Sequence, residues 1–332
     1  MLIDKLNAAM ASASGTAHNF YLLRLREALN AVEKAAATTQ QLDEYVRQLD
    51  KLLSEPHFET NAHFTNKFAQ TLGEAHFSLL CSNAGVALRR IPEVQNLKTP
   101  DFESGALSGN LFFEVKTLSV VGGEAGVEQA ITDSVDINLT LEEKRLRGDR
   151  VAIAEGEIAP YANKVRSDTR ILDVTNVLVE KARQNIKADQ FANPNTFLVL
   201  NLSMLNLPAG DMGLLRPSYP DNGLFPTSVT GTLWAMAFGK PGMLIQSEPE
   251  FEGKPCVEGE FTKMGILQDA EFTAVKGIVF VVHPLRKPAR VCALFRDFEE
   301  MNEQSPDILA ELQKVVGVAW NDSTDRNGWQ LR

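Results

Sequence analysis

Apolar residues recur along the chain with two different spacings, and these spacings separate its helices from its strands. Residues 58 to 83 carry apolar side chains three or four positions apart, which predicts a helix, and Gly85 follows where a helix-ending glycine is common. The same spacing predicts a second helix over 173 to 191. The continuous apolar run from 196 to 202 predicts a central strand that is covered on both faces.

Shorter apolar runs predict the remaining strands of one sheet. Five of them have strand length: 86 to 91, 99 to 103, 110 to 118, 277 to 283 and 290 to 295. The last two would form a hairpin that extends the sheet. A closing helix is predicted over 297 to 315, with an interruption near Pro306. Helices that alternate with strands in this way predict an α/β fold.

The pattern and the composition together predict five parts of the chain. They are a helical hairpin at 1–55, an α/β core at 56–204, an elaboration at 205–275, a sheet extension with the closing helix at 276–320, and a polar tail at 321–332. The elaboration is rich in proline and glycine. We expect it to be strand-rich and to form part of a substrate wall.

Two apolar stripes within the first 55 residues predict an antiparallel helix pair. The stripes are Leu22, Leu25, Leu29 and Val32, and then Leu42, Tyr45, Leu49 and Leu52. Packing of this pair onto the protein's own core is one interpretation. A homodimer formed through these N-terminal helices, or a clamp on the substrate, is the functional alternative, and the sequence leaves these open.

The composition is that of an ordinary globular protein, with 44% hydrophobic and 23% charged residues. No apolar run is long enough for a membrane span, and the N-terminus lacks a signal-peptide pattern. The three cysteines are widely spaced, which argues against a zinc cluster. We therefore expect a cytoplasmic protein with no membrane partner.

The charge is acidic overall but unevenly distributed. A net charge of −10 argues against a protein that coats nucleic acid nonspecifically, because such binding depends on neutralising phosphates. Residues 164 to 187 nevertheless hold six basic and three acidic side chains, and residues 286 to 296 hold four basic side chains and no acid. A local basic cleft and ordinary solvated surface are both compatible with these segments.

Residues 99 to 116 carry the most specific chemical signal in the chain. Pro100 and Asp101 are followed by a turn rich in Gly, Ser and Asn, and then by an apolar run that contains Glu114 and Lys116. Side chains alternate faces along a strand, so these last two residues share a face. Burying a carboxylate and an ammonium costs free energy unless partners are present. A metal ion and a phosphate would be such partners.

The Glu-x-Lys pattern alone is weak, because the chain contains three copies of it. The copy at 142–144 lies in a charged segment and predicts a solvated helical face, and the copy at 252–254 lies between two prolines and predicts a loop. Only the copy at 114–116 follows an apolar strand and an upstream Pro-Asp. Its structural alternative is an edge hairpin with a surface ion pair.

The Pro-Asp and Glu-x-Lys arrangement resembles the PD-(D/E)XK nuclease superfamily, the restriction-endonuclease-like phosphodiesterases. The resemblance covers about residues 58 to 203 and implies a mixed sheet flanked by helices, and a Mg²⁺- or Mn²⁺-dependent endonuclease that acts on DNA. It implies that Asp101 and Glu114, with the Val115 carbonyl, bind the metal. Lys116 would then orient the attacking water or the scissile phosphate.

The resemblance also points to residues on the two predicted helices. Lys181 and Gln184 interrupt an apolar stripe and match the Lys and Gln that the family often aims at its site. The common family form has Tyr four residues after the Gln, whereas this chain has Ala188. A lysine that reaches out to solvent from a packed face is the alternative for Lys181. Glu74 matches the family's acidic residue on the first helix and is expected near the metal, or else is a solvated carboxylate.

Two function classes compete with a nuclease. One is a nucleic-acid-binding or assembly protein that keeps the nuclease fold without turnover, and the other is an interaction protein that acts through its N-terminal helices. Intact Asp101, Glu114 and Lys116 favour the enzyme, and the net charge of −10 favours a protein without turnover.

Overall fold

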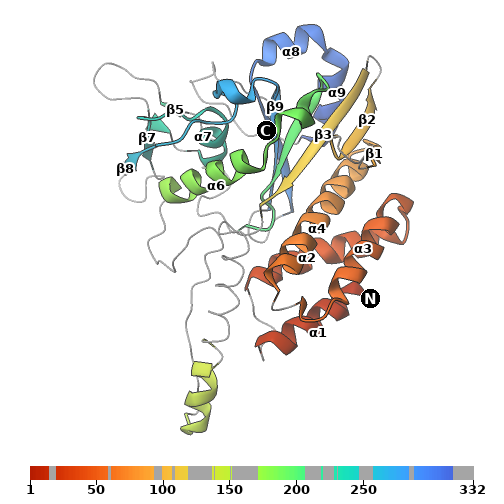
Figure 1. Ribbon diagram of the computed structural model, residues 1–332, viewed down its shortest axis with the longest axis vertical. Coiled ribbons are helices and arrows are strands. Elements are labelled where there is room, and N and C mark those ends of the chain that lie inside the picture. The colour runs from red at the N-terminus through yellow and green to blue at the C-terminus, as the bar shows by residue number, and fades with distance from the viewer. Residues whose placement is uncertain are drawn as a thin grey trace. The chain divides into compact units, whose positions relative to one another are not determined.

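The computed structural model describes the chain in two compact units (Figure 1). The described residues are 1–14, 20–58, 61–92, 99–106, 109–118, 137, 139–149, 151, 171–205, 218–219, 228–229, 231–246, 257–283 and 288–316. Unit 1 comprises Met1–Leu79 and Ser119–Asp168, and unit 2 comprises Leu80–Leu118 and Thr169–Arg332. The predicted polar tail and the Glu-x-Lys copy at 252–254 lie outside the described residues.

Unit 1 begins with three packed helices where the sequence predicted a pair. Its elements are α1 (Leu2–Ser14), α2 (Phe20–Ala36), η1 (Gln40–Leu42), α3 (Asp43–Leu53) and α4 (Ala62–Asn83), whose last turn belongs to unit 2. Both predicted stripes are buried wherever their side chains are described. The added helix buries Leu2 and Leu6, and it is tied to α3 by an ion pair of 2.6 Å between Lys5 and Asp50.

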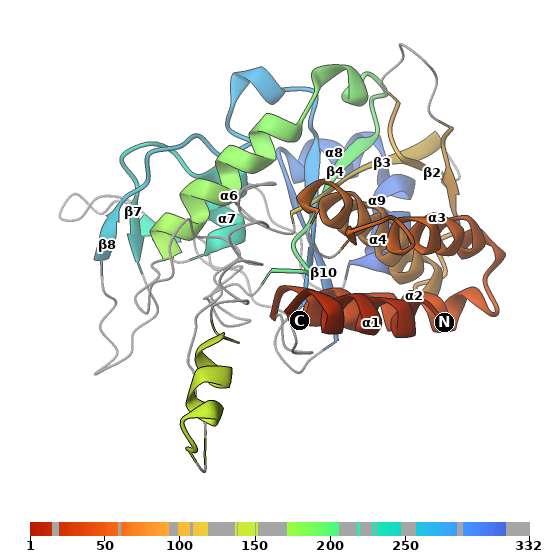
Figure 2. The same ribbon diagram turned by 60° about the horizontal axis from the view of Figure 1, so that its bottom comes forward.

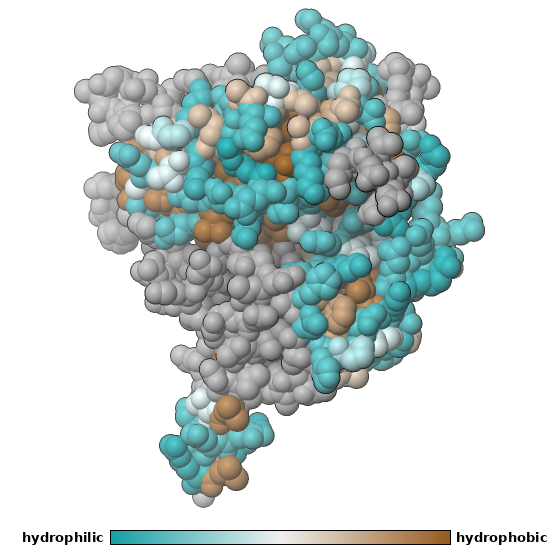
Figure 3. Space-filling view, viewed as in Figure 1, coloured by the Kyte–Doolittle hydropathy of each residue, from teal (hydrophilic) through white to brown (hydrophobic). Residues whose placement is uncertain are grey.

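A short exposed helix in unit 1 contains the Glu-x-Lys copy at 142–144. Residues 139–146 are helical, and Arg147 pairs with Glu143 at 3.2 Å on the solvated surface. Leu139 and Leu146 are also exposed, and the apolar patches of this segment stand out at the bottom of Figure 3. The prediction of a solvated helical face is confirmed.

Unit 2 is built on a mixed sheet of six strands, which confirms the α/β class. The strands are β1 (Leu88–Arg90), β2 (Phe102–Ala106), β3 (Gly109–Thr117), β4 (Thr196–Asn201), β9 (Gly277–Val282) and β10 (Arg290–Phe295). They lie side by side in the order β1-β2-β3-β4-β9-β10. The β3–β4 and β4–β9 pairs are parallel and the others antiparallel.

Burial explains why the central strands read as continuous apolar runs. Every residue of β4 and β9 is buried, and the Phe197 and Phe295 rings meet edge to face at 5.8 Å. Parallel neighbours require a crossover connection. Between β3 and β4 the chain passes through the helix at 139–146 of unit 1, and the described part of the crossover in unit 2 is α6 (Ile171–Asn185) followed by the 3-10 helix η3 (Ala188–Phe191).

Helices flank both faces of the sheet (Figures 1 and 2). The closing segment forms α8 (Phe298–Gln304) and α9 (Pro306–Val315), so the predicted interruption at Pro306 is confirmed. Helix α9 meets the face that carries Ser104, whose hydroxyl donates to Glu311 at 3.5 Å. Alternation along β3 places Glu114 on the opposite face, where it meets η3.

The elaboration contains a second sheet and a buried helix. Its strands are β5 (Ser218–Tyr219), β6 (Ser228–Val229), β7 (Leu244–Gln246) and β8 (Val257–Glu260), and the helices are α7 (Thr232–Phe238) and η5 (Ala270–Phe272). All seven residues of α7 are buried. The backbone passes so close to α7 at Gly265 that a Cβ there would lie 2.7 Å from the Ala237 carbonyl. Among the described residues, no helix combines the length and apolarity needed to cross a membrane.

Candidate functional site

Asp101 is held at the end of the β2–β3 ladder by a backbone hydrogen bond. Alternate residues of β3 donate toward β4, as Phe112 does to the Asn195 carbonyl at 3.0 Å, so the backbone groups of Val115 face the β2 side. The paired part of β2 starts only at Phe102. The Val115 N–H therefore donates to the Asp101 carboxylate instead, at 2.7 Å.

Glu114 is the most deeply buried acid of the site, with 1% of its surface exposed. Its Oε1 accepts hydrogen bonds from the Lys116 ammonium, 2.5 Å away, and from the Gln190 side-chain amide. Its Oε2 is buried and has no hydrogen-bond partner among the described residues. One carboxylate oxygen is thus doubly satisfied while the other is left without a partner, which is uncommon for a buried polar atom.

The electrostatics of the site show the cost of this arrangement. Burial, and next the nearby Asp101 carboxylate, raise the pKa of Glu114 to about 7, although Lys116 and Gln190 lower it. The two carboxylates therefore repel each other, and this repulsion adds to the cost of burying Glu114. A bound cation would relieve this repulsion and favour the ionised form of Glu114.

The donor set suits a magnesium ion. Within the described ranges, no group of three or more His, Cys, Asp or Glu side chains could hold a metal. Magnesium, however, is usually bound through one or two carboxylates together with waters and substrate phosphates. The partnerless oxygen of Glu114, the Asp101 carboxylate and the Val115 carbonyl on the β2 side are oxygen donors of this kind.

The prediction that Gln184 faces the site is wrong. Helix α6 ends at Asn185, because Lys187 is extended with φ −121° and ψ 123°, whereas the sequence predicted a helix to 191. Gln184 is exposed and donates to Glu180 at 3.1 Å. Lys181 is partly exposed, and the described residues show no contact between its ammonium and Glu114 or Lys116.

Gln190 reaches Glu114 in place of Gln184, and the sequence analysis did not single it out. It lies on η3 and is 8% exposed. Lys187 and Gln190 have the three-residue spacing of a capping box, in which a Gln side chain bonds back to the backbone that opens a helix. A lysine ammonium cannot accept a hydrogen bond as the Ser or Thr of a capping box does, so the sequence carried only the Gln half of this signal.

Glu74 lies on α4 in unit 1, where its carboxylate accepts a hydrogen bond from the Tyr45 hydroxyl at 3.3 Å. This contact gives Glu74 a structural role between α3 and α4. Its assignment to the metal site stays a prediction.

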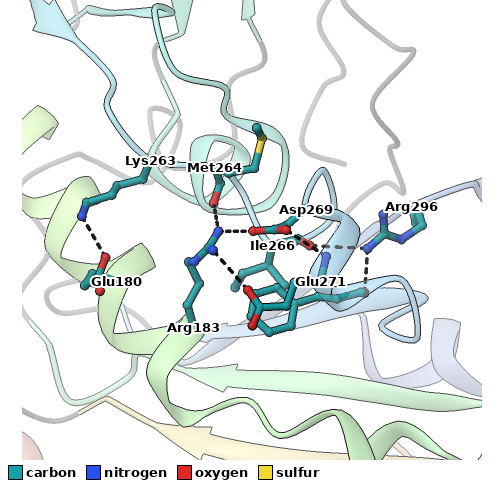
Figure 4. A network of polar contacts seen from close by, with 9 residues as sticks. Glu180, Arg183, Lys263, Met264, Ile266, Asp269, Glu271 and Arg296 are labelled. Atoms are coloured by element: carbon teal, nitrogen blue, oxygen red, sulfur yellow. Dashed lines mark hydrogen bonds and ion pairs between the residues drawn. The ribbon is translucent and has the colours of Figure 1, made fainter.

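A second charged cluster of unit 2, the Arg183 network, joins α6 to residues 257–272 (Figure 4). The Arg183 guanidinium donates to the Met264 carbonyl at 3.0 Å, pairs with Asp269 and lies 3.6 Å from Glu271. It also stands over the Phe272 ring, 5.4 Å from its centroid.

The other members of the network are paired in the same way. Lys263 pairs with Glu180 at 2.8 Å, and Arg296 donates to the Phe272 carbonyl, also at 2.8 Å. The charged groups of this cluster have partners within the protein. We therefore interpret the network as structural, because it holds α6 against residues 257–272.

No family model, curated protein or solved structure matches this chain. The interpretation of the site therefore depends on its own geometry and on the chemistry of its side chains.

Proposed function

We propose that this chain is a Mg²⁺-dependent phosphodiesterase with a restriction-endonuclease-like core, and that its substrate is DNA. The observation that supports the proposal is the buried Glu114 carboxylate beside Asp101 and Lys116, one oxygen of which has no hydrogen-bond partner in the described part of the chain. Burial of such a group opposes folding unless a ligand completes it. A surface ion pair on an edge hairpin, the structural alternative, would not place Glu114 at 1% exposure on a central strand.

Each residue has a distinct part in the proposed hydrolysis. Asp101 and Glu114 would hold the cation, which when bound lowers the pKa of a water and stabilises charge on the phosphate. Lys116 supplies a second positive charge, which belongs to the protein and not to the metal. With 21% of its side chain exposed, its ammonium can turn from Glu114 toward a phosphate oxygen or orient the attacking water. The burial around Glu114 strengthens these interactions, because water screens them less.

Cleavage of supercoiled plasmid tests the proposal. The wild-type protein should convert plasmid to nicked or linear DNA with Mg²⁺ or Mn²⁺ and should lose this activity with EDTA. Asp101→Asn and Lys116→Ala should each reduce the rate by at least about a hundredfold, as expected when a group that stabilises transition-state charge is removed. Gln184→Ala is the matched control and should cleave like the wild type, because Gln184 contacts Glu180 and solvent.

The other outcomes of the experiment separate the alternatives. Equal cleavage by wild type, Asp101→Asn and Lys116→Ala would assign the activity to another site or to a contaminant. Cleavage of RNA but not plasmid under the same conditions would keep the chemistry and replace the substrate. Binding of DNA without any metal-dependent cleavage would favour the protein that keeps the fold without turnover.

A further inference from the structure

The amide of Gln190 is held at both ends. Its Oε1 accepts a hydrogen bond from the Lys187 backbone N–H at 3.3 Å, and its Nε2 donates to Glu114 Oε1. The Gln190 backbone N–H in turn donates to the Lys187 carbonyl at 3.0 Å. An N–H group needs an acceptor and an ionised carboxylate can only accept, so both contacts require the same orientation of the amide.

The two donors of the cluster converge on the same oxygen of Glu114. Lys116 and Gln190 both donate to Oε1, and Oε2 receives no donor among the described residues. Lys116 alone could not fix the carboxylate, because its ammonium is a point charge on a flexible stem. The Gln190 amide is planar, 8% exposed and anchored to the backbone of η3.

We infer that Gln190 is a positioning residue, which occupies Glu114 Oε1 so that Oε2 is presented to a divalent cation. The inference rests on the proposed function, because it concerns the same cation site. It assigns no contact between Gln190 and the cation or the DNA. Gln190 acts through Glu114, and its own anchor is the backbone of Lys187.

Replacement of the amide by an apolar side chain of similar length separates this role from simple packing. Gln190→Met keeps most of the side-chain volume but removes the donor and the acceptor. Gln184→Met is the matched control, because it makes the same substitution at an exposed position that contacts Glu180. Gln190→Ala is a second variant, in case the Met side chain disturbs folding.

The measurement is calorimetric titration of Mn²⁺ alone into each purified full-length protein, together with its thermal midpoint. Groups that orient a metal ligand typically contribute 10- to 100-fold to metal affinity. We expect the Mn²⁺ Kd to rise by about this factor in Gln190→Met and Gln190→Ala, and to stay unchanged in Gln184→Met. Because a packing role alone would lower the midpoint and leave the Kd unchanged, the two readouts distinguish the roles.

The possible failures are distinguishable. If the wild type binds Mn²⁺, Asp101→Asn does not, and both Gln190 variants bind like the wild type, the inference about Gln190 is overturned and the proposed function stands. If the wild type neither binds Mn²⁺ nor cleaves DNA, the proposed function is overturned together with the inference that rests on it.

Discussion

The two charged clusters of unit 2 use the same kinds of side chain with opposite results. In the Arg183 network, the partly buried Arg183 binds Met264 and Asp269, and Lys263 pairs with Glu180 (Figure 4). In the Glu114 cluster one ammonium and one amide both donate to Glu114 Oε1 near the Asp101 carboxylate, and the buried Glu114 Oε2 has no hydrogen-bond partner among the described residues. Within the described ranges the charges of the first cluster are paired, whereas the second cluster keeps a carboxylate oxygen without a hydrogen-bond partner.

Exposure explains why the protein tolerates the difference. The Glu271 side chain is 71% exposed, so water stabilises whatever charge the Arg183 network does not pair. Glu114 is only 1% exposed, so water does not stabilise its charge in this way. Its pKa is raised as a result. A saturated cluster contributes to folding, whereas an unsaturated buried cluster is typical of a site that a ligand completes.

The largest effect is expected from the packing of α6, the helix that carries Arg183. Leu178 on α6 is fully buried, and Leu178→Ala should lower the free energy of unfolding by about 2–5 kcal/mol through lost burial and a cavity. Urea unfolding measures this directly. Lys181→Ala on the same helix should change the free energy of unfolding by less than about 0.5 kcal/mol, as is usual for surface substitutions. Equal losses in both variants would contradict the observed burial of α6.

Breaking the Arg183 network should lower the free energy of unfolding by less than Leu178→Ala does, but by more than a surface substitution does. Arg183→Ala removes the ion-pair partner of the Asp269 carboxylate, whose side chain is 16% exposed, and the donor to the Met264 carbonyl. We expect a loss of about 1–3 kcal/mol in the free energy of unfolding, with metal binding retained. Lys263→Ala removes the exposed pair of the same network and should cost about 0–1 kcal/mol. A stabilised Arg183→Ala variant would remove the contrast between the clusters.

Substitution in the Glu114 cluster should raise the free energy of unfolding, whereas substitution in the Arg183 network should lower it. The pKa of Glu114 is about 7 in the folded protein against an ordinary value of 4.5, so the folded state binds the proton more tightly. This contribution to stability is present below pH 4.5 and is lost as the pH rises through 7. Glu114→Gln, which resembles the protonated acid, should avoid the loss.

The metal-free Glu114→Gln variant should therefore become more stable relative to the wild type as the pH rises from 4.5 to above 7. Urea unfolding in EDTA across this range measures the difference between the two proteins. A difference that does not change with pH would mean that Glu114 titrates as an ordinary carboxylate.

The smallest effect is expected at Gln184. Its amide donates to Glu180 on the exposed side of α6, so Gln184→Ala should leave the stability, Mn²⁺ affinity and DNA cleavage of the protein close to those of the wild type. Parallel assays of Gln184→Ala and Gln190→Ala compare one residue type at two positions. A large loss of cleavage in Gln184→Ala would show that Gln184 contributes to the active site, contrary to this prediction.

Local patterns predicted more of the protein than long-range ones. Strand alternation and the turn before it placed Asp101, Glu114 and Lys116 together, because adjacent strands bring near neighbours in sequence side by side. The continuous apolar runs correctly predicted β4 and β9 as buried central strands.

The errors have physical causes outside those patterns. The apolar spacing continues past Asn185, but the Asn185 side chain bonds the Lys181 carbonyl and Lys187 is extended, so α6 stops and Gln190 replaces Gln184. The first helix was overlooked because the burial of Leu2 and Leu6 comes from packing on α2 and α3. Helix α7 is buried all round, so its sequence carries no helical periodicity.

The most direct test of the central claim, that a divalent cation completes the Glu114 cluster, is the thermal midpoint as a function of Mg²⁺ concentration. A ligand that binds only the folded state raises the midpoint with concentration. We predict that Mg²⁺ raises the midpoint of the wild type and leaves that of Glu114→Gln unchanged, because the variant lacks the ionised oxygen beside Asp101. An unchanged midpoint in the wild type, or an equal rise in both proteins, would contradict the account.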